Sequence, residues 1–371
     1  MDIIENVFDI KYEPLAGSSL INIFRLLSQN NFQVTPRYLP RFLYACMLSS
    51  ILSPFRVSEH FKTHKKITHT KIEKDPIFII GHWRSGTTYL HNVLSLDDQY
   101  GCCSTFHATI PGLFLTREET FKPILQASIP ETRPMDDVKM GPDLPQEEEY
   151  AIANITPYGF YNGWCFPKNI ERYNEYISFF NSTSSVKDEW KQTYLYFIKK
   201  LTCYHQGKQL LLKNPAHTAR IELLLDMFPN AKFIHIYRNP YDVFYSMMKF
   251  MRIVLPRYCV QAPPSVDMMK NHIFSIYKSL YASYFKQKNL ISSDAIVEVR
   301  YEDFISDPLS ETKKIFETLH LSNYTDLEKK LLAYIASQKS FRTSNYNMST
   351  ELKNRISDEF SFAFDAFQYS R

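Results

Sequence analysis

Residues 81–88, GHWRSGTT, combine two glycines with a cation and hydroxyl groups. An apolar run, IFII, comes before them, and an apolar-periodic segment follows. The polar side chains of the loop are those of Arg84, Ser85, Thr87 and Thr88. A glycine turn between a strand and a helix directs backbone N–H groups and the positive end of the helix dipole at one point, where an anion binds. The hydroxyls could donate hydrogen bonds to phosphate oxygens there, although Thr87 or Thr88 could equally cap the helix.

The loop departs from a nucleotide-binding P-loop, which reads G-x-x-x-x-G-K-[ST]. Thr87 stands at the lysine position, and Arg84, inside the loop, supplies the cation. ATP and GTP sites also need an aspartate at the end of another apolar strand to hold Mg²⁺. Here the strands LLLK and FIHIYR end in Lys213 and Arg238. We therefore expect a site built of cations, without a metal, that suits a phosphosulfate better than ATP·Mg²⁺.

A second candidate anion site lies in the sequence FIHIYRNPYDVFYS. Arg238 stands at the carboxyl end of an expected strand, where open α/β sheets bind their ligands. Ser246 follows eight residues later, inside the next expected helix. Together the two side chains could hold one further phosphate. The alternatives are a cap or surface ion pair for Arg238 and an ordinary helical position for Ser246.

Short apolar runs alternate with helical patterns on both sides of a long central segment. The expected strands are PIFII, CCSTFHA, QLLLK, AKFIHIYR and AIVEVR, and the expected helices between them carry apolar residues at helical spacing. This order indicates a parallel sheet covered on both faces. The fold class is therefore α/β, a P-loop-type three-layer α/β/α arrangement.

We expect residues 1–371 to form a single domain. Residues 1–70 should add two or three helices that end in a basic linker, HFKTHKKITHTKIEK, and residues 76–308 should form the α/β core. A proline-rich, acidic and aromatic segment, about 116–180, is expected to be a helical and irregular lid with a helix starting near Gln146. Another helix should span residues 186–204. Residues 309–371 should form C-terminal helices and a tail.

Composition narrows the choice of partners and compartment. A net charge of +4 with no long basic run gives no reason to expect a nucleic-acid partner. The six cysteines show no metal-binding spacing, and the acidic start, MDIIENVFDIKYEP, is unlike a signal peptide, so we expect reduced thiols in the cytoplasm. The apolar run at 41–55 is too short to span a bilayer. A packed amphipathic helix is the favoured interpretation, and weak peripheral membrane contact is the alternative.

Two motifs give the chain a specific resemblance. G-x-W-R-S-G-T-T-x-L, residues 81–90, and Y-R-N-P-x-D-V-x-x-S, residues 237–246, resemble those of the sulfotransferases that use 3′-phosphoadenosine 5′-phosphosulfate. LLLKNPAHTARI, RPMDDVKMGPDLPQEEEYA and VEVRYEDFISDP are similar to a bacterial-type branch of that family. The resemblance covers about residues 76–308.

The resemblance implies roles for the residues of both motifs. Arg84, Ser85, Gly86, Thr87 and Thr88 would hold the 5′-phosphosulfate, with Arg84 stabilising charge on the bridging oxygen. Arg238 and Ser246 would hold the 3′-phosphate, and Lys213 would face the sulfuryl oxygens. The chain lacks the C-terminal R-K-G-x-x-G stretch of many cytosolic members, for which Arg342 is a candidate substitute.

Transfer of a sulfuryl group also requires a base for the acceptor hydroxyl. Members of the family commonly place a histidine or glutamate after the strand that follows the P-loop helix, which implies His107. Glu147 and Glu148, in QEEEY, are the rivals, although glutamates at a helix start are also explained by the helix dipole.

The expected acceptor is a small lipophilic alcohol. The segments PYGFYNGWCFP and MKFMRIVLPRY would give a pocket apolar walls. We expect a sterol, phenol or lipid alcohol, and a peptide tyrosine or a glycan stays an alternative. A nucleotide kinase or NTPase with an altered loop, and a binding protein that does no chemistry, are the rival functions. The sequence predicts no oligomeric state.

Overall fold

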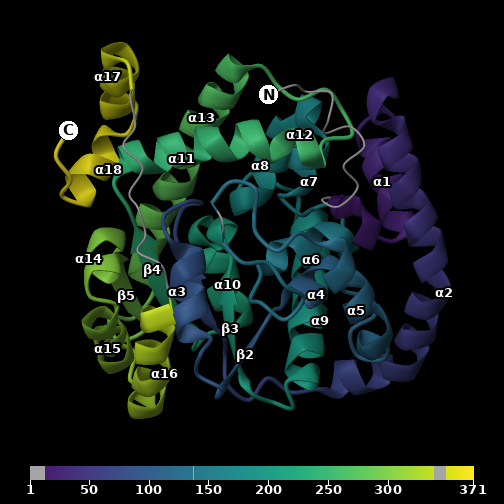
Figure 1. The fold of residues 1–371 in the computed structure, drawn as a ribbon, viewed down its shortest axis with the longest axis horizontal. Helices are drawn as coiled ribbons and strands as arrows, with labels where there is room; N and C mark the ends of the chain where they lie inside the picture. The colour runs from purple at the N-terminus through teal and green to yellow at the C-terminus, as the bar shows by residue number, and fades with distance from the viewer. Residues whose placement is uncertain (1–12, 137, 338–347) are drawn as a thin grey trace. The chain divides into compact units, whose positions relative to one another are not determined.

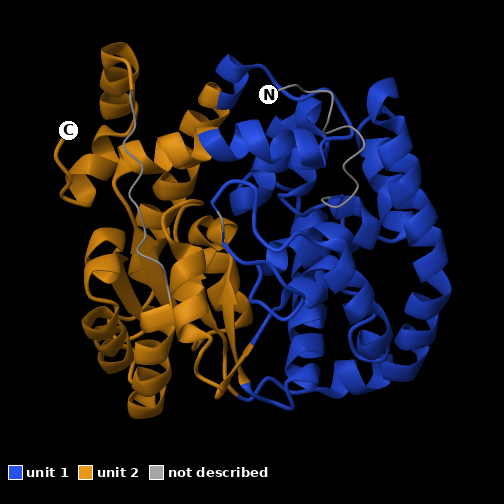
Figure 2. Ribbon diagram, in the orientation of Figure 1, with its two compact units in different colours: residues 1–73, 102–208, 249–269 blue, residues 74–101, 209–248, 270–371 orange. Residues whose placement is uncertain are grey.

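The computed structural model describes residues 13–136, 138–337 and 348–371, and their contacts divide the chain into two compact units (Figures 1 and 2). Unit 1 comprises residues 1–73, 102–208 and 249–269, and unit 2 comprises residues 74–101, 209–248 and 270–371. That residues 1–371 form a single domain stays a prediction.

Unit 2 contains the sheet. The strands are β1 Ile77–Ile80, β2 Tyr100–Cys102, whose last residue belongs to unit 1, β3 Gln209–Lys213, β4 Lys232–Tyr237 and β5 Ile296–Arg300. They lie in the order β2-β3-β1-β4-β5, and β1 pairs in parallel with both β3 and β4. All four residues of β1 are buried, as the centre of a parallel sheet requires. The α/β class and the parallel sheet are confirmed.

Helices follow the strands as the apolar periodicity predicts. Helix α3 packs against β1 and β3, and helices α14 and α15 pack against β5. The helices of this part of the chain are α3 Thr87–Leu94, α10 Ile221–Met227, α11 Pro240–Ile253, α13 Val266–Gln287, α14 Tyr301–Ser306, α15 Pro308–Thr318, α16 Tyr324–Ser337, α17 Thr350–Glu359 and α18 Ser361–Ala366, with the 3-10 helices η5 Pro215–Ala219 and η6 Lys288–Leu290. Helices α11 and α13 each continue across the boundary between the units.

Unit 1 is built of helices. They are η2 Pro14–Gly17, α1 Leu20–Gln29, η3 Pro36–Tyr38, α2 Leu39–His69, α4 Thr105–Thr109, α5 Glu118–Ser128, α6 Glu148–Ile155, α7 Asn162–Cys165, η4 Pro167–Asn169, α8 Ile170–Ser178, α9 Ser184–Tyr204 and α12 Leu255–Tyr258. Helix α2 packs against both α1 and α9, as Figure 1 shows.

Two expectations about local structure are wrong, those for residues 60–74 and for the strand before His107. The basic stretch 60–74 is not a linker as far as His69, because α2 continues through it and buries Glu59, Thr63 and Ile67 at four-residue spacing. Residues 116–180 agree with the expected mixture of helical and irregular structure, and α6 starts at Glu148, close to the predicted Gln146. Strand β2 ends at Cys102, so His107 lies in helix α4 and not at a strand end.

Candidate active site

The glycine loop of unit 2 has the backbone that an anion cradle needs. Strand β1 ends at Ile80, and Gly81 (φ 142°) donates its N–H to Thr218 Oγ1 at 2.7 Å. Arg84 takes a left-handed conformation (φ 71°), which is rare for a residue with a side chain and is found where function holds the backbone. Helix α3 starts directly after Gly86, so the loop connects the central strand to a helix N-terminus.

Gly86 is the N-cap of α3, which corrects the alternative that Thr87 or Thr88 caps the helix. A glycine offers no side chain to the first N–H groups of α3, and a helix start of this kind favours an anion. Gly86 also has φ 98°, and a Cβ at this position would lie 2.3 Å from Tyr301 Cδ2. Glycine is therefore required here by both backbone conformation and space.

Arg84 reaches the second motif. Its Nε donates a hydrogen bond to Ser246 Oγ at 2.8 Å, and Arg238 Nη1 donates to the carbonyl oxygen of Arg84 at 3.4 Å. The two motifs are more than a hundred positions apart in the sequence, yet their side chains touch. Ser246 is therefore not an ordinary helical serine, since its hydroxyl orients the loop arginine.

Arg238 lies at the end of β4 between a ring and a carboxylate. Its guanidinium sits 4.3 Å above the centre of the Tyr301 ring, and its Nη2 lies 3.4 Å from Asp242 Oδ2. The ion pair foreseen as an alternative for Arg238 is thus present. It leaves the arginine oriented on an aromatic face, an arrangement that suits a planar guanidinium for phosphate recognition.

Lys213 lies at the end of β3 and faces the helix that follows the loop. Its Nζ is 3.4 Å from Thr88 Oγ1, and the residue is only 2 % exposed. Burial, followed by the charge of Lys213, lowers the pKa of His91 to about 3, so His91 is neutral near neutral pH. Lys213 is therefore a nearly buried cation beside the hydroxyl of Thr88, and not a solvated lysine at a strand end.

Unit 2 thus brings Arg84, Lys213, Thr88, Arg238 and Ser246 together at the carboxyl ends of three strands. Ser85 is fully buried. Arg342 falls in 338–347, outside the described residues. No group of three or more His, Cys, Asp or Glu side chains suited to a metal occurs in the part of the chain that the structure describes.

Two residues of this site escaped the sequence reasoning. Tyr301 packs against Gly86 and under Arg238, and Thr218 accepts the hydrogen bond of Gly81. Both lie within segments that carry the family resemblance, VRYEDF and KNPAHTARI. Their place in these segments is the signal that could have identified them, since Tyr301 directly follows β5 and Thr218 lies in the 3-10 helix that follows β3.

His107 has a structural environment in unit 1. It is 2 % exposed, and its ring Nδ1 accepts a hydrogen bond from the backbone N–H of Ser104 at 3.2 Å while Ser104 Oγ accepts one from the His107 N–H. Burial, followed by the charges of His205, Lys200 and Lys122, lowers the pKa of His107 to about 3. The imidazole is therefore neutral near neutral pH, and its Nδ1 is engaged in the hydrogen bond that caps the start of α4.

The rival carboxylates differ in accessibility. Glu148 is fully buried and accepts a hydrogen bond from the Tyr194 hydroxyl at 3.2 Å. Glu147, at the N-cap of α6, is partly exposed and accepts a hydrogen bond from the Tyr161 hydroxyl. Of the three candidate bases, Glu147 is therefore the one residue that is not buried.

Aromatic side chains from the two apolar segments pack together beside Glu147 within unit 1. Tyr161 stacks on Trp164 with ring centres 4.0 Å apart, and Trp164 meets Phe250 at 5.1 Å. The ring centres of Tyr150 and Tyr161 are 4.6 Å apart. The segments PYGFYNGWCFP and MKFMRIVLPRY thus contact each other through aromatic rings, and that they form the walls of an acceptor pocket stays a prediction.

Comparison with known proteins adds the family. A model of the sulfotransferase family matches residues 76–326, which include both motifs. The chain belongs to the sulfotransferase family. It is accordingly a sulfotransferase enzyme and not an NTPase with an altered loop.

Named relatives agree with this assignment. The chain is 30 % identical over 348 residues to the omega-hydroxy-beta-dihydromenaquinone-9 sulfotransferase Stf3 of Mycobacterium bovis, covering 94 % of this chain and 89 % of the relative, and it matches the protein of the same name from Mycobacterium tuberculosis equally well. Among solved structures, sulfotransferase STF9 of Mycobacterium avium is similar with a TM-score of 0.70 at 17 % identity, covering 93 % of this chain and 90 % of that one. Sulfotransferase STF1 of Mycobacterium tuberculosis gives a TM-score of 0.63 at 17 % identity, over 89 % and 87 %.

Proposed function

We propose that this sulfotransferase moves a sulfuryl group from 3′-phosphoadenosine 5′-phosphosulfate to the hydroxyl of a lipophilic alcohol. The observation that carries the proposal is the contact between Arg84 of the glycine loop and Ser246, 2.8 Å apart, beside Arg238. It links two clusters of anion-binding groups within one unit. A donor with phosphate groups at both its 5′ and 3′ positions matches that pair.

The residues present suit such a donor. The N–H groups at the start of α3 and the hydroxyls of Thr87 and Thr88 would bind the 5′ group, and Arg238 with Ser246 would bind the 3′-phosphate. Tyr301, stacked under Arg238, would keep the guanidinium plane in position. Recognition of the 3′-phosphate would separate this donor from ordinary adenine nucleotides.

The bound phosphosulfate supplies the sulfuryl group for an in-line transfer. As the sulfur–oxygen bond to the phosphate breaks, Arg84 would stabilise the negative charge left on that phosphate. Lys213, almost free of water, would stabilise the sulfuryl oxygens. Cations fixed before the reaction lower its barrier because they need no reorganisation when charge develops.

We assign the base to Glu147 rather than to His107 or Glu148. A base must reach the acceptor proton, and Glu147 is the accessible member of the three. The hydrogen bond from Tyr161 would orient its carboxylate. The proton of the acceptor hydroxyl would pass to Glu147 as the new oxygen–sulfur bond forms.

The acceptor class follows from the relative and from the aromatic cluster. The name of the mycobacterial relative describes a sulfotransferase of an omega-hydroxylated dihydromenaquinone. In this chain, Tyr161 and Trp164 place flat apolar surface next to Glu147. A hydroxyl at the end of a lipid chain, in a cytoplasmic reaction, fits both observations.

The assay is transfer of radiolabelled sulfuryl from the 3′-phosphorylated donor to a panel of acceptors. The panel would hold an omega-hydroxylated isoprenoid quinone, a sterol, a phenol, a tyrosine peptide and a glucosamine. We expect label on the isoprenoid alcohol. Label on the glycan or the peptide alone would refute the acceptor class, and label on nothing, with no binding of the donor, would refute the donor.

A further inference from the structure

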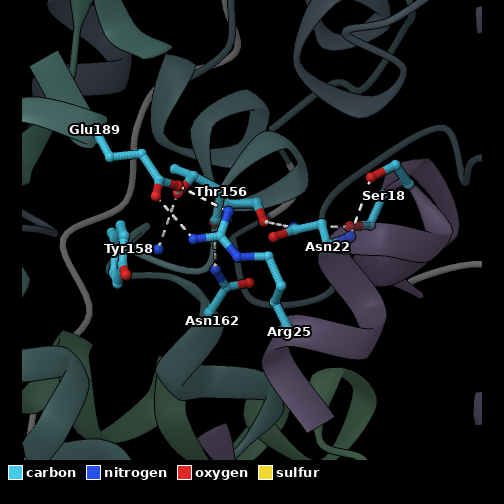
Figure 3. Close-up of polar contacts among 9 residues, drawn as sticks. Ser18, Asn22, Arg25, Thr156, Tyr158, Asn162 and Glu189 are labelled. Atoms are coloured by element: carbon cyan, nitrogen blue, oxygen red, sulfur yellow. Dashed lines mark hydrogen bonds and ion pairs between the residues drawn. The ribbon is translucent and has the colours of Figure 1, made fainter. Parts of the chain in front are cut away.

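Helix α1 turns its polar side chains inward. Asn22 Nδ2 donates to the carbonyl of Ala153 at 3.0 Å, and Arg25 forms a two-pronged ion pair with Glu189 at 2.8 Å (Figure 3). Thr156 adds a hydrogen bond to the same carboxylate at 2.9 Å. These contacts fix the rotation of α1 about its axis, because any other rotation would leave buried polar groups unpaired.

Three large apolar side chains of α1 nevertheless face outward, while Ile23 and Leu26 are buried. Ile21 is 76 % exposed and Phe24 is 62 % exposed, and Leu20 is exposed beside them. An ordinary amphipathic helix has one apolar stripe, which faces the core, whereas α1 carries a second apolar set on its exposed side.

Helix α2 is also apolar on both sides, since Phe42, Ala45 and Leu52 are buried. Its buried side includes Ser49, which donates to the carbonyl of Ser18 at 2.6 Å, and Glu59, which pairs with Lys200. Its exposed side carries large apolar side chains about one turn apart, namely Leu39, Leu43, Met47, Ile51, Val57 and Phe61. These six residues and the three of α1 are called the apolar face below.

The apolar face is long and uncharged. From Leu39 to Phe61 it runs roughly 33 Å along α2 at 1.5 Å per residue. Every charged side chain of α2 in that range, Arg41, Arg56 and Glu59, is buried or partly buried. No helix among the described residues is long and apolar enough to cross a bilayer. The apolar face can therefore lie along the surface of a bilayer, whereas α2 is not long and apolar enough to cross one.

The exposed charges at both ends of α2 are positive. Arg37 is exposed just before α2, and Lys62, Lys65 and Lys66 are exposed at its C-terminal end. Lys65 follows Phe61 by four residues and so continues the same side of the helix. Between Leu20 and Lys71 the sequence contains one acidic residue, Glu59, which is buried.

We propose that the apolar face lies on the surface of an anionic lipid bilayer. An exposed apolar stripe bordered by lysine and arginine is what a helix in the membrane interface presents, with the apolar side chains among the acyl chains and the cations at the headgroups. The inward polar contacts of α1 and α2 hold this side outward without help from the membrane. Membrane binding goes beyond sulfuryl transfer and does not depend on it.

A second copy of the chain is the weaker occupant. In a two-fold contact the same patch meets itself. Here that contact would bring Arg37 and the lysines of both copies together, and residues 20–71 contain no exposed acidic side chain to pair them. Charge complementarity therefore favours phosphate headgroups over self-association.

The test is co-sedimentation of the full chain with vesicles of phosphatidylcholine, alone or with phosphatidylglycerol. We expect binding that rises with the anionic fraction. Leu43→Gln/Met47→Gln/Phe61→Gln should lower the partition coefficient at least about tenfold. Lys62→Gln/Lys65→Gln/Lys66→Gln should lower it about fivefold per charge on anionic vesicles and leave neutral vesicles unaffected. Leu332→Gln, a similarly exposed leucine on α16, is the matched control and should behave like wild type.

Three results would overturn the proposal. Wild-type protein that stays in solution with anionic vesicles is the first, and an apolar-face variant that binds like wild type is the second. The third is a wild-type dimer in light scattering that the apolar-face variant converts to a monomer while neither binds vesicles. If the triple variant is destabilised in urea, the single variant Phe61→Gln, at a side chain 82 % exposed, makes the same comparison. Vesicle binding is read without a turnover, so its failure leaves the proposed reaction standing.

Discussion

Replacing Arg238 by glutamine should remove recognition of the 3′-phosphate while leaving the rest of donor binding in place. The substitution keeps a planar polar end but deletes the charge at the end of β4. The side chain is only 14 % exposed and stacks on Tyr301, so a phosphate there would meet a cation that is held in position and largely shielded from water.

The size of the effect depends on two partners of the Arg238 guanidinium, the bound 3′-phosphate and the carboxylate of Asp242. Hydrogen bonds to charged groups contribute about 1.5–3 kcal/mol each, which is roughly a 10- to 100-fold change in Kd. Asp242, 3.4 Å from the guanidinium, already compensates part of the charge. We therefore expect the lower half of that range, roughly 10- to 30-fold, for a ligand that carries the 3′-phosphate.

Isothermal titration with 3′-phosphoadenosine 5′-phosphate and with 5′-AMP measures this directly. Arg238→Gln should raise the Kd of 3′-phosphoadenosine 5′-phosphate by this factor and change the Kd of 5′-AMP less than about twofold. Arg252→Gln, an exposed arginine in the last turn of the same helix that follows β4, is the control and should change neither. An equal loss for both ligands would show that Arg238 supports the loop in general, and no loss for either would refute the 3′-phosphate site.

Three further predictions concern the loop, the base and acid stability. Gly86→Ala should lower the free energy of unfolding in urea more than Gly207→Ala does. Both glycines have positive φ, where the backbone strain of an alanine costs about 1 kcal/mol, but only at Gly86 would the added Cβ collide with a neighbour, at 2.3 Å. Equal losses for the two variants would contradict this. Glu147→Gln should lower kcat about 10²- to 10⁴-fold with donor Kd unchanged, whereas His107→Gln should mainly lower stability; the opposite pattern in single-turnover assays would return the base to His107. Burial raises the pKa of Glu189, but the hydrogen bonds from Arg25 and Thr156 outweigh this, so the pKa lies below its ordinary value of 4.5. The stability that the carboxylate adds is therefore complete above pH 4.5 and is lost as the pH falls. Glu189→Gln should weaken the dependence of the free energy of unfolding on pH in acid, and an unchanged dependence would count against the ion pair.

Strands and the loop could be predicted from the sequence because each carries its own local signal. The runs IFII, QLLLK and KFIHIY are short, apolar and bounded by polar residues, and all three became strands of the parallel sheet. Once three strands are parallel, their carboxyl ends meet at one edge. Arg84, Lys213 and Arg238 stand at those ends, so their convergence was implied by the topology.

Contacts between distant segments carry no such signal. Nothing in the spacing shows that Tyr301 fills the space beside Gly86 or that the Arg84 side chain turns to Ser246. The role of His107 depended on a strand reaching it, but β2 ends five residues earlier and a helix cap takes its place. The apolar run at 41–55 predicts a packed amphipathic helix, and α2 does pack against α1 and α9, but apolar periodicity does not reveal which of its apolar side chains face the core. The buried partners of Arg41 and Glu59 decide that, and they come from other parts of the chain.

The most direct test of the proposed donor site is a crystal structure with 3′-phosphoadenosine 5′-phosphate bound. We predict the 5′-phosphate at the N–H groups that open α3, and the 3′-phosphate within hydrogen-bond distance of both Arg238 and Ser246. A nucleotide bound away from residues 84–88, or a 3′-phosphate exposed to solvent and out of reach of Arg238, would contradict the account.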